Sequence, residues 1–168
     1  GCRTESITGV LNEYGERIYV CPACLEEGYS YCCHCDEYYP ASRMTLVDNT
    51  YVCPNCVEEH CAKCAECGEI HHNNSLHDAY DKYGNEVLIC DDCRYESYRC
   101  CECCGTVHHE DNLHCVHGRY NSEINVCDNC LNNYYGECER CGEYFNTAEL
   151  TNGLCPDCYR KQEDEDNE

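Results

Sequence analysis

The chain has 168 residues, a formal net charge of −22, and 24 cysteines, which are as numerous as its leucine, isoleucine, valine and phenylalanine residues together. So few aliphatic side chains exclude an ordinary hydrophobic core for a domain of this length. With 11 basic residues against 33 acidic ones, direct binding to nucleic acid is disfavoured, and no apolar run is long enough to predict a membrane span.

Eighteen of the cysteines form nine regularly spaced Cys-x-x-Cys doublets. Two thiolates at this spacing bind one tetrahedral metal ion, so two doublets complete a four-sulfur zinc site. Structural zinc contributes on the order of 10–16 kcal/mol per site, because its binding energy is also folding energy, and it therefore replaces the missing core. The alternative is a disulfide framework, which an even number of cysteines allows but whose spacings are usually irregular.

Residues 1–31 are predicted to be a partial or degenerate first finger. They contain a hairpin turn at Tyr14-Gly15 and a doublet, Cys21/Cys24, with no opening doublet before it. Since Gly1 stands where the glycine after a turn would be, we expect the partner cysteines to precede it and the chain to be a fragment of a longer protein. Cys2 is the alternative third ligand.

Four further fingers and an acidic tail follow. The distance from Cys53 to Cys90 equals that from Cys90 to Cys127, and the flanking residues align, which indicates an internal repeat. The predicted fingers span residues 32–63, 64–100, 101–137 and 138–162, and the tail spans residues 163–168.

Each finger has two kinds of doublet. Opening doublets are followed by Asp36, Gly68, Gly105 or Gly142, residues suited to a turn of positive φ that directs backbone N–H groups at thiolates. In closing doublets the first cysteine is followed by proline or aspartate, residues that favour the start of a helix. These doublets are therefore predicted at helix N-termini, where the helix dipole stabilises thiolates.

A hairpin is predicted between the two doublets. Alternation at Val87/Ile89 and Ile124/Val126 indicates its second strand. Its turns are predicted at Tyr83-Gly84-Asn85 and Tyr120-Asn121-Ser122. Apolar anchors recur at fixed positions and predict a small core in each finger. They are Tyr38, Ile70, Val107 and Tyr144; Met44, Leu76, Leu113 and Leu150; and Val20, Val52, Ile89, Val126 and Leu154.

This order of turn, hairpin and helix-borne doublet resembles the treble-clef zinc fingers, and the tandem arrangement is similar to LIM domains. The chain departs from LIM in its spacer, since seven residues join Cys56 to Cys64 where LIM modules have two. The resemblance implies a small, metal-stabilised α+β fold of serial treble-clef fingers and a role in protein interaction. The acidic, tyrosine-rich repeats are also similar to those of phage and gut-bacterial proteins, which implies a phage or bacterial source.

Two partitions of the doublets remain open. A hairpin returns the chain to its start, whereas a seven-residue helix carries it about 10 Å away, so pairing across the longer gap is favoured. The rival partition joins doublets across the seven-residue gap and strands Cys155/Cys158. The favoured sites are Cys32/Cys35/Cys53/Cys56, Cys64/Cys67/Cys90/Cys93, Cys101/Cys104/Cys127/Cys130 and Cys138/Cys141/Cys155/Cys158. They predict four Zn²⁺ ions, with a fifth possible at Cys21/Cys24, and iron is the alternative metal.

Other cysteines and the histidines carry weaker signals. Six cysteines outside the doublets are interpreted as small buried side chains, with alternative metal ligation or redox sensing as the functional hypothesis. His71 and His108 occupy positions that hold Tyr39 and Phe145 in other fingers, which predicts a packing role. A secondary metal patch is the hypothesis for His72, His77, His109, His114 and His117. The six cysteines are Cys2, Cys33, Cys61, Cys100, Cys103 and Cys115.

These features favour a binding protein over an enzyme, because four-cysteine sites are closed and structural. We expect a protein-interaction module or scaffold in the cytoplasm or another reducing compartment, with a protein partner that presents a basic surface. The alternatives are a metal-buffering or thiol redox protein and an acidic nucleic-acid mimic that blocks a basic protein.

Overall fold

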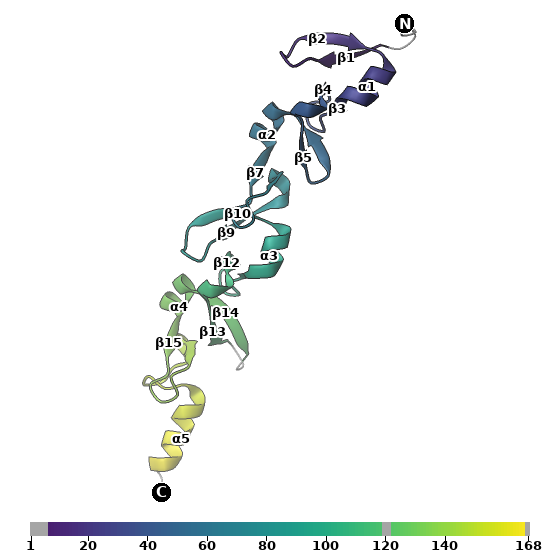
Figure 1. Ribbon diagram of the computed structural model, residues 1–168. Helices are drawn as coiled ribbons and strands as arrows, with labels where there is room; N and C mark the ends of the chain where they lie inside the picture. The colour runs from purple at the N-terminus through teal and green to yellow at the C-terminus, as the bar shows by residue number, and fades with distance from the viewer. Residues whose placement is uncertain (1–6, 119–121, 167–168) are drawn as a thin grey trace. The chain divides into compact units, whose positions relative to one another are not determined.

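The computed structural model describes residues 7–118 and 122–166, and side chains as far as residue 162. This part of the chain is a small α+β fold in which short hairpins alternate with short helices (Figure 1). It divides into two compact units, one of Gly1–His77 with Leu88–Asp91 and one of Asp78–Val87 with Asp92–Glu168. The predicted finger boundaries stay a prediction, and Cys2 and the turn residues Tyr120 and Asn121 lie outside the described residues.

A hairpin precedes each of the first four closing doublets. The predicted strands at Val87/Ile89 and Ile124/Val126 are confirmed. Gly15 and Gly84 have φ values of 80° and 82°, as their predicted turns require. The paired strands are β1 (Thr8–Leu11) with β2 (Arg17–Val20), β5 (Thr45–Val47) with β6 (Thr50–Val52), β9 (Leu76–Tyr80) with β10 (Glu86–Cys90), and β13 (Leu113–His117) with β14 (Glu123–Cys127). Before the last doublet, an isolated bridge joins Thr151 and Leu154.

A second set of hairpins encloses the opening doublets and was not predicted from sequence. Each consists of two three-residue antiparallel strands on either side of the doublet, and a short 3₁₀ turn follows the second strand. The pairs are β3 (Tyr29–Tyr31) with β4 (Tyr38–Pro40), β7 (Cys61–Lys63) with β8 (Ile70–His72), β11 (Tyr98–Cys100) with β12 (Val107–His109), and β15 (Tyr135–Glu137) with β16 (Tyr144–Asn146). The 3₁₀ turns are η1 (Ala41–Arg43), η2 (Asn73–Ser75), η3 (Glu110–Asn112) and η5 (Thr147–Glu149).

The helices begin within the closing doublets, as predicted, but they do not fill the seven-residue gaps. In the gap between Cys56 and Cys64, the helix ends at His60 and strand β7 takes up the remainder. The gap therefore holds the end of a helix and a short strand, and the prediction of a helical linker is wrong for its second part. The helices are α1 (Pro22–Gly28), α2 (Pro54–His60), α3 (Asp91–Ser97), α4 (Asp128–Tyr134) and α5 (Pro156–Asp166), which enters the predicted acidic tail. No helix in residues 7–118 and 122–166 is long and apolar enough to cross a membrane.

Buried side chains gather in small clusters around cysteines. In one cluster Val47 and Val52 pack with Cys32, Cys53 and Cys56. Of the anchors predicted to precede closing doublets, Val52, Ile89 and Val126 are fully buried, whereas Val20 and Leu154 are partly buried. Tyr144, a predicted anchor, is instead exposed, and the neighbouring Phe145 enters the core in its place. Fully buried Val47 was missed because β5, the three-residue strand that it ends, is too short to show alternation. Fully buried Val116, which lies inside the five-residue strand β13, was also missed.

Candidate metal centres

Each opening doublet lies on a tight turn that the hairpin strands around it hold in place. The N–H of Cys64 donates to the carbonyl of Glu69 at 2.9 Å, and the N–H of Gly68 donates to the carbonyl of Cys64 at 2.9 Å. Gly68, Gly105 and Gly142 have φ values of 76°, 79° and 76°, and Asp36 has 58°, so the predicted positive-φ turns are present. The turn thus presents two sulfurs on one side of the backbone.

A second contact ties this turn to the hairpin that follows. The residue after the first cysteine donates its N–H to a carbonyl two positions before the closing doublet. Ala65 donates to Leu88 at 2.8 Å and Glu102 to Asn125 at 2.9 Å. The equivalent bonds from Cys33 to Tyr51 and from Glu139 to Gly153 measure 3.1 and 3.0 Å. Because the hairpin returns the chain to its own start, this bond brings the closing doublet beside the opening one.

The helix that carries the closing doublet places its cysteines next to those of the opening doublet. In α2 and α4 the first cysteine is the N-cap and the second lies in the first turn. The N–H of this first cysteine donates to the sulfur of the first opening cysteine in all four fingers. The donor and acceptor pairs are Cys53 to Cys32 at 3.3 Å, Cys90 to Cys64 at 3.4 Å, Cys127 to Cys101 at 3.3 Å, and Cys155 to Cys138 at 3.3 Å.

The structure therefore gathers sixteen cysteines into four groups, each able to hold a metal ion. Within a group the sulfur atoms all lie within 4.8 Å of one another. The partition is the one across the longer gap. Every group has three buried cysteines and one exposed cysteine, the second of the opening doublet. The groups are Cys32/Cys35/Cys53/Cys56, Cys64/Cys67/Cys90/Cys93, Cys101/Cys104/Cys127/Cys130 and Cys138/Cys141/Cys155/Cys158.

The sulfur separations fit a tetrahedral ion. The distances from Cys35 to Cys53, from Cys67 to Cys90 and from Cys104 to Cys127 are 3.9, 4.0 and 3.9 Å. A tetrahedral site with metal–sulfur bonds of 2.3 Å has sulfur–sulfur edges of about 3.8 Å. These separations are nearly twice the length of a disulfide bond, about 2.05 Å, so the three pairs are not disulfide-bonded.

The thiols of a group differ in how readily they ionise. Burial raises the pKa of Cys32, Cys64 and Cys138, but backbone N–H groups outweigh it and bring each pKa down to about 6. Burial raises the pKa of Cys56 and Cys130, which neighbouring sulfurs raise further. Each group thus has one thiolate ready at neutral pH, and a cation is needed to stabilise the others beside it.

In the third group the prepared thiolate is Cys104. Burial opposes ionisation there as well, but a hydrogen bond from Thr106 at 2.9 Å lowers the pKa of Cys104 to about 6. Thr106 also contacts Nε2 of His108 at 2.7 Å, and burial lowers the pKa of that imidazole. Because a thiolate only accepts, Thr106 donates to Cys104 and accepts from a neutral His108.

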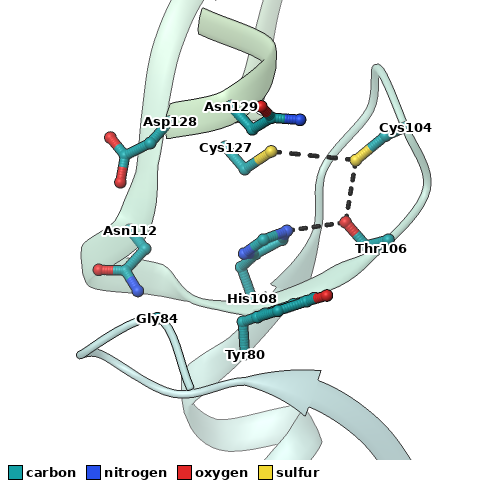
Figure 2. Close-up of a pocket in the computed structure, with 9 residues that line it drawn as sticks. All are labelled: Tyr80, Gly84, Cys104, Thr106, His108, Asn112, Cys127, Asp128 and Asn129. Atoms are coloured by element: carbon teal, nitrogen blue, oxygen red, sulfur yellow. Dashed lines mark hydrogen bonds between the residues drawn. The ribbon is translucent and has the colours of Figure 1, made fainter. Parts of the chain in front are cut away.

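The same residues line a cavity of about 390 Å³ (Figure 2). One wall is the ring of Tyr80, which stacks on His108 with centroids 4.9 Å apart. The opposite side holds Cys104 and Cys127, so the cavity exposes one edge of the sulfur group.

The predicted first-finger site is only partly described. The sulfurs of Cys21 and Cys24 lie 3.5 Å apart, close enough to share an ion. Cys2 lies outside the described residues. The fifth metal site stays a prediction.

The interpretation of the six additional cysteines as buried side chains is wrong for four of them, and Cys2 lies outside the described residues. Cys33, Cys100, Cys103 and Cys115 are exposed, and Cys61 is half-buried. The first three lie at or beside the turns of opening doublets, where the interior is already filled by the grouped sulfurs. Exposed cysteines still make contacts, since Cys103 hydrogen-bonds to Cys130 and the thiol of Cys33 donates to Thr50 at 3.6 Å.

Most histidines form ion pairs or ring stacks. Nδ1 of His71 donates to Asp48 at 2.8 Å, whereas the ring of His108 packs on Tyr80, which agrees with the packing role predicted for His108. The predicted patch separates: His77 contacts Asp91 at 2.7 Å, His114 contacts Asp128 at 2.6 Å, and His117 contacts Glu143 at 2.9 Å and stacks on Phe145. His109 packs edge-on against Tyr98 and accepts from the N–H of Asp111.

His72 instead joins a group that sequence reasoning missed. Its ring lies with Cys33 and His34, and the ligand atoms of the three are within 4.8 Å of one another. Residue spacing did not indicate this group, because His34 and His72 belong to different repeats. The available signal was the departure of Cys33-His34 from Ala65-Glu66, the same turn positions of the next finger.

Comparisons with known proteins returned no match: no family model, no curated protein and no solved structure resembles this chain at a significant level.

Proposed function

We propose that this protein is a zinc-binding array of treble-clef type that acts as a protein-interaction module. The observation that supports zinc is the repeated four-sulfur group with tetrahedral spacing and an N–H···S bond in each finger. Thiolate donors favour zinc over calcium or magnesium, and four such ligands leave no open position for catalysis. The metal is thus assigned a structural role.

The observation that supports a binding role is the pair of tyrosines at hairpin tips. Tyr14 and Tyr83 are 86% and 77% exposed, and each precedes a glycine of positive φ. The side chain of Asn12 accepts from the N–H of Tyr14 at 2.9 Å, and that of Asp81 accepts from the N–H of Tyr83 at 2.8 Å. The tips are therefore held rigid, and an aromatic ring on a rigid turn loses little entropy when a partner covers it.

The charge of the chain indicates what kind of partner these rings meet. A net charge of −22 repels other acidic surfaces and attracts basic ones. Opposite charge speeds the encounter of the two proteins, while the tyrosine rings, once the partner covers them, supply most of the affinity. The partner we propose is a protein with a basic surface that has an apolar recess for such a ring.

The test compares the zinc-loaded full chain with Tyr14→Ala/Tyr83→Ala as bait in cell extract at moderate salt. A protein that the wild type retains is then purified and its affinity measured. We expect the tip variant to bind this protein at least about tenfold more weakly than the wild type does, since aromatic side chains buried at an interface dominate its binding energy. Tyr95→Ala is the control, because Tyr95 is 80% exposed but lies on helix α3 and not at a hairpin tip.

Two results would contradict this function. One is retention of only those proteins that an unrelated acidic chain of equal charge also retains. The other is equal affinity for the wild type, the tip variant and the Tyr95→Ala control.

A further inference from the structure

We propose that Cys33, His34, Cys61 and His72 form an additional transition-metal site, separate from the four cysteine groups. Nε2 of His34 lies 3.0 Å from Nδ1 of His72, and the same Nδ1 lies 3.7 Å from the sulfur of Cys61. Cys33 falls within 4.8 Å of both imidazoles. A tetrahedral zinc ion with two imidazoles and two thiolates has nitrogen–nitrogen edges of about 3.3 Å and nitrogen–sulfur edges of about 3.6 Å.

Backbone structure places the four ligands in two pairs. Cys33 and His34 stand between Cys32 and Cys35, at the tip of an opening turn. Cys61 and His72 are directly opposite each other in the antiparallel pair β7–β8, which encloses the next opening doublet. A cross-strand pair holds two side chains close together without help from a metal, so half of the site is fixed by the sheet.

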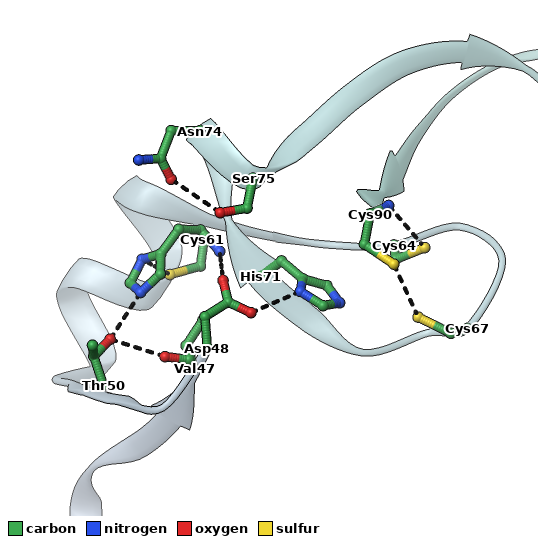
Figure 3. A network of polar contacts seen from close by, with 11 residues as sticks. Val47, Asp48, Thr50, Cys61, Cys64, Cys67, His71, Asn74, Ser75 and Cys90 are labelled. Atoms are coloured by element: carbon green, nitrogen blue, oxygen red, sulfur yellow. Dashed lines mark hydrogen bonds and ion pairs between the residues drawn. The ribbon is translucent and has the colours of Figure 1, made fainter. Parts of the chain in front are cut away.

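Hydrogen bonds fix which nitrogen of His72 is available. Thr50 donates its single hydroxyl hydrogen to the carbonyl of Val47 at 2.9 Å, a contact drawn in Figure 3. Thr50 must therefore accept in its contact with Nε2 of His72 at 2.9 Å, and it also accepts from the thiol of Cys33 at 3.6 Å. Nε2 carries the proton, and the lone pair of Nδ1 points at His34 and Cys61. Metal-binding histidines are typically oriented in this way by an oxygen on the far nitrogen.

Asp48 fixes the strand that carries His72. One carboxylate oxygen accepts the backbone N–H of His72 at 3.0 Å. The other accepts from Nδ1 of His71 at 2.8 Å (Figure 3). The ring of His60 stacks on His34 with centroids 4.5 Å apart and covers one of its faces. The ligands are thus positioned by groups that are not themselves ligands.

The repeats of this chain show that these residues are not needed for the cysteine groups. Where this finger has Cys33-His34, later fingers have Ala65-Glu66, Glu102-Cys103 and Glu139-Arg140. Where β7 begins with Cys61, the equivalent strands begin with Tyr29, Tyr98 and Tyr135. Where β6 begins with Thr50, the corresponding hairpin positions hold Val87 and Ile124. The proposed ligands Cys33, His34 and Cys61 and the orienting hydroxyl of Thr50 therefore occur together between one pair of neighbouring repeats.

The chemistry of the donors selects the metal. Two thiolates and two neutral imidazoles balance the charge of one divalent ion, and binding releases the two thiol protons to solvent. Zn²⁺ and Co²⁺ accept this donor set in tetrahedral geometry, whereas Ca²⁺ and Mg²⁺ require oxygen. A bound ion would cross-link the opening turn of residues 32–35 to the strand pair of the next finger.

The test replaces the turn with the sequence of its neighbour, Cys33→Ala/His34→Glu, in the full chain. Since Ala65-Glu66 already occupies an equivalent turn, the variant is expected to fold and to keep its four-cysteine ions. Native mass spectrometry of zinc-loaded protein should show one ion fewer than in the wild type. Cys115→Ser, which removes an exposed cysteine of β13, should lose none.

A cobalt readout separates this site from the four-cysteine groups. Imidazole is a stronger-field ligand than thiolate, so the Co²⁺ difference spectrum between wild type and variant should show d–d bands at shorter wavelength than those of the variant itself. Cys61→Tyr, which introduces the residue of the equivalent strands, should remove the same bands. Equal ion counts and superimposable cobalt spectra for the wild type and both variants would overturn the proposal, whatever the four-cysteine groups bind.

Discussion

At the scale of single residues, the four sulfur groups share a framework but differ in the side chains that surround them. The position two residues after the opening doublet holds Glu37, Glu69, Thr106 and Glu143. Only Thr106 offers a hydroxyl, and it lies 2.9 Å from the exposed sulfur of Cys104. The third group therefore has a side-chain donor where a carboxylate stands in the others.

We expect Thr106→Val to make this group lose its metal at higher pH. Burial raises the pKa of Cys104 and the Thr106 hydroxyl lowers it, with a net result of about 6. A lowered thiol pKa stabilises the folded, metal-binding form above the unfolded pKa, and this contribution is lost as pH falls through about 6. Removing a hydrogen bond of about 1 kcal/mol should shift the midpoint upward by about 0.7 pH unit.

The shift is measured by native mass spectrometry of the zinc-loaded chain over a pH series. Thr147→Val is the matched control, since Thr147 bonds to the carbonyl of Tyr134 and to no sulfur. An unchanged release profile in Thr106→Val would show that its hydroxyl does not tune the site.

At the scale of elements, the glycine and proline residues at turns and helix starts decided which elements could be predicted from sequence. Gly68 and Gly84 marked turns, and Pro54 marked a helix start, because each has a local backbone requirement. The three-residue strands β3, β7, β11 and β15 gave no signal, because their pairing depends on the turn they enclose and not on side-chain alternation. The group around His34 and His72 is harder still, since it depends on contact between separate repeats.

Gly68→Ala should weaken the turn of its finger even though there is space for a methyl group. Gly68 has φ of +76° and no atom within 4 Å of an added Cβ, so the cost is backbone strain alone. That strain is about 1–2 kcal/mol for a residue with a side chain. Competition with a zinc chelator should therefore show one ion bound about tenfold more weakly, as 1.4 kcal/mol corresponds to a factor of ten.

The control for this change is Gly28→Ala, which also adds a methyl group with nothing within 4 Å. Gly28 ends helix α1 without a positive φ, so alanine should be tolerated or slightly stabilising. Equal zinc retention by both variants would contradict the role assigned to the positive-φ turn.

At the scale of the whole molecule, the described residues 7–118 and 122–162 bury their apolar side chains in several small clusters and share no common core. The cluster around Val116 and Val126 contains three cysteines, and the cluster around Phe145 contains three more. Apolar burial and metal ligation thus occupy the same few residues, so removing the ion also removes what orders the cluster. Each finger should then gain or lose its ion with little effect on distant ones, as in repeat proteins whose units contact only their neighbours.

The sharpest test of this organisation is the double variant Cys155→Ser/Cys158→Ser. In the structure these cysteines share a group with Cys138 and Cys141, so the variant should bind one zinc ion fewer than the wild type. If doublets instead paired across the seven-residue gaps, Cys155/Cys158 would hold no shared ion and the count would not change. Native mass spectrometry of the full chain gives the count directly. Chemical shifts of fingers before residue 101 should stay unchanged in the variant, because the loss is confined to the last group and its immediate neighbour.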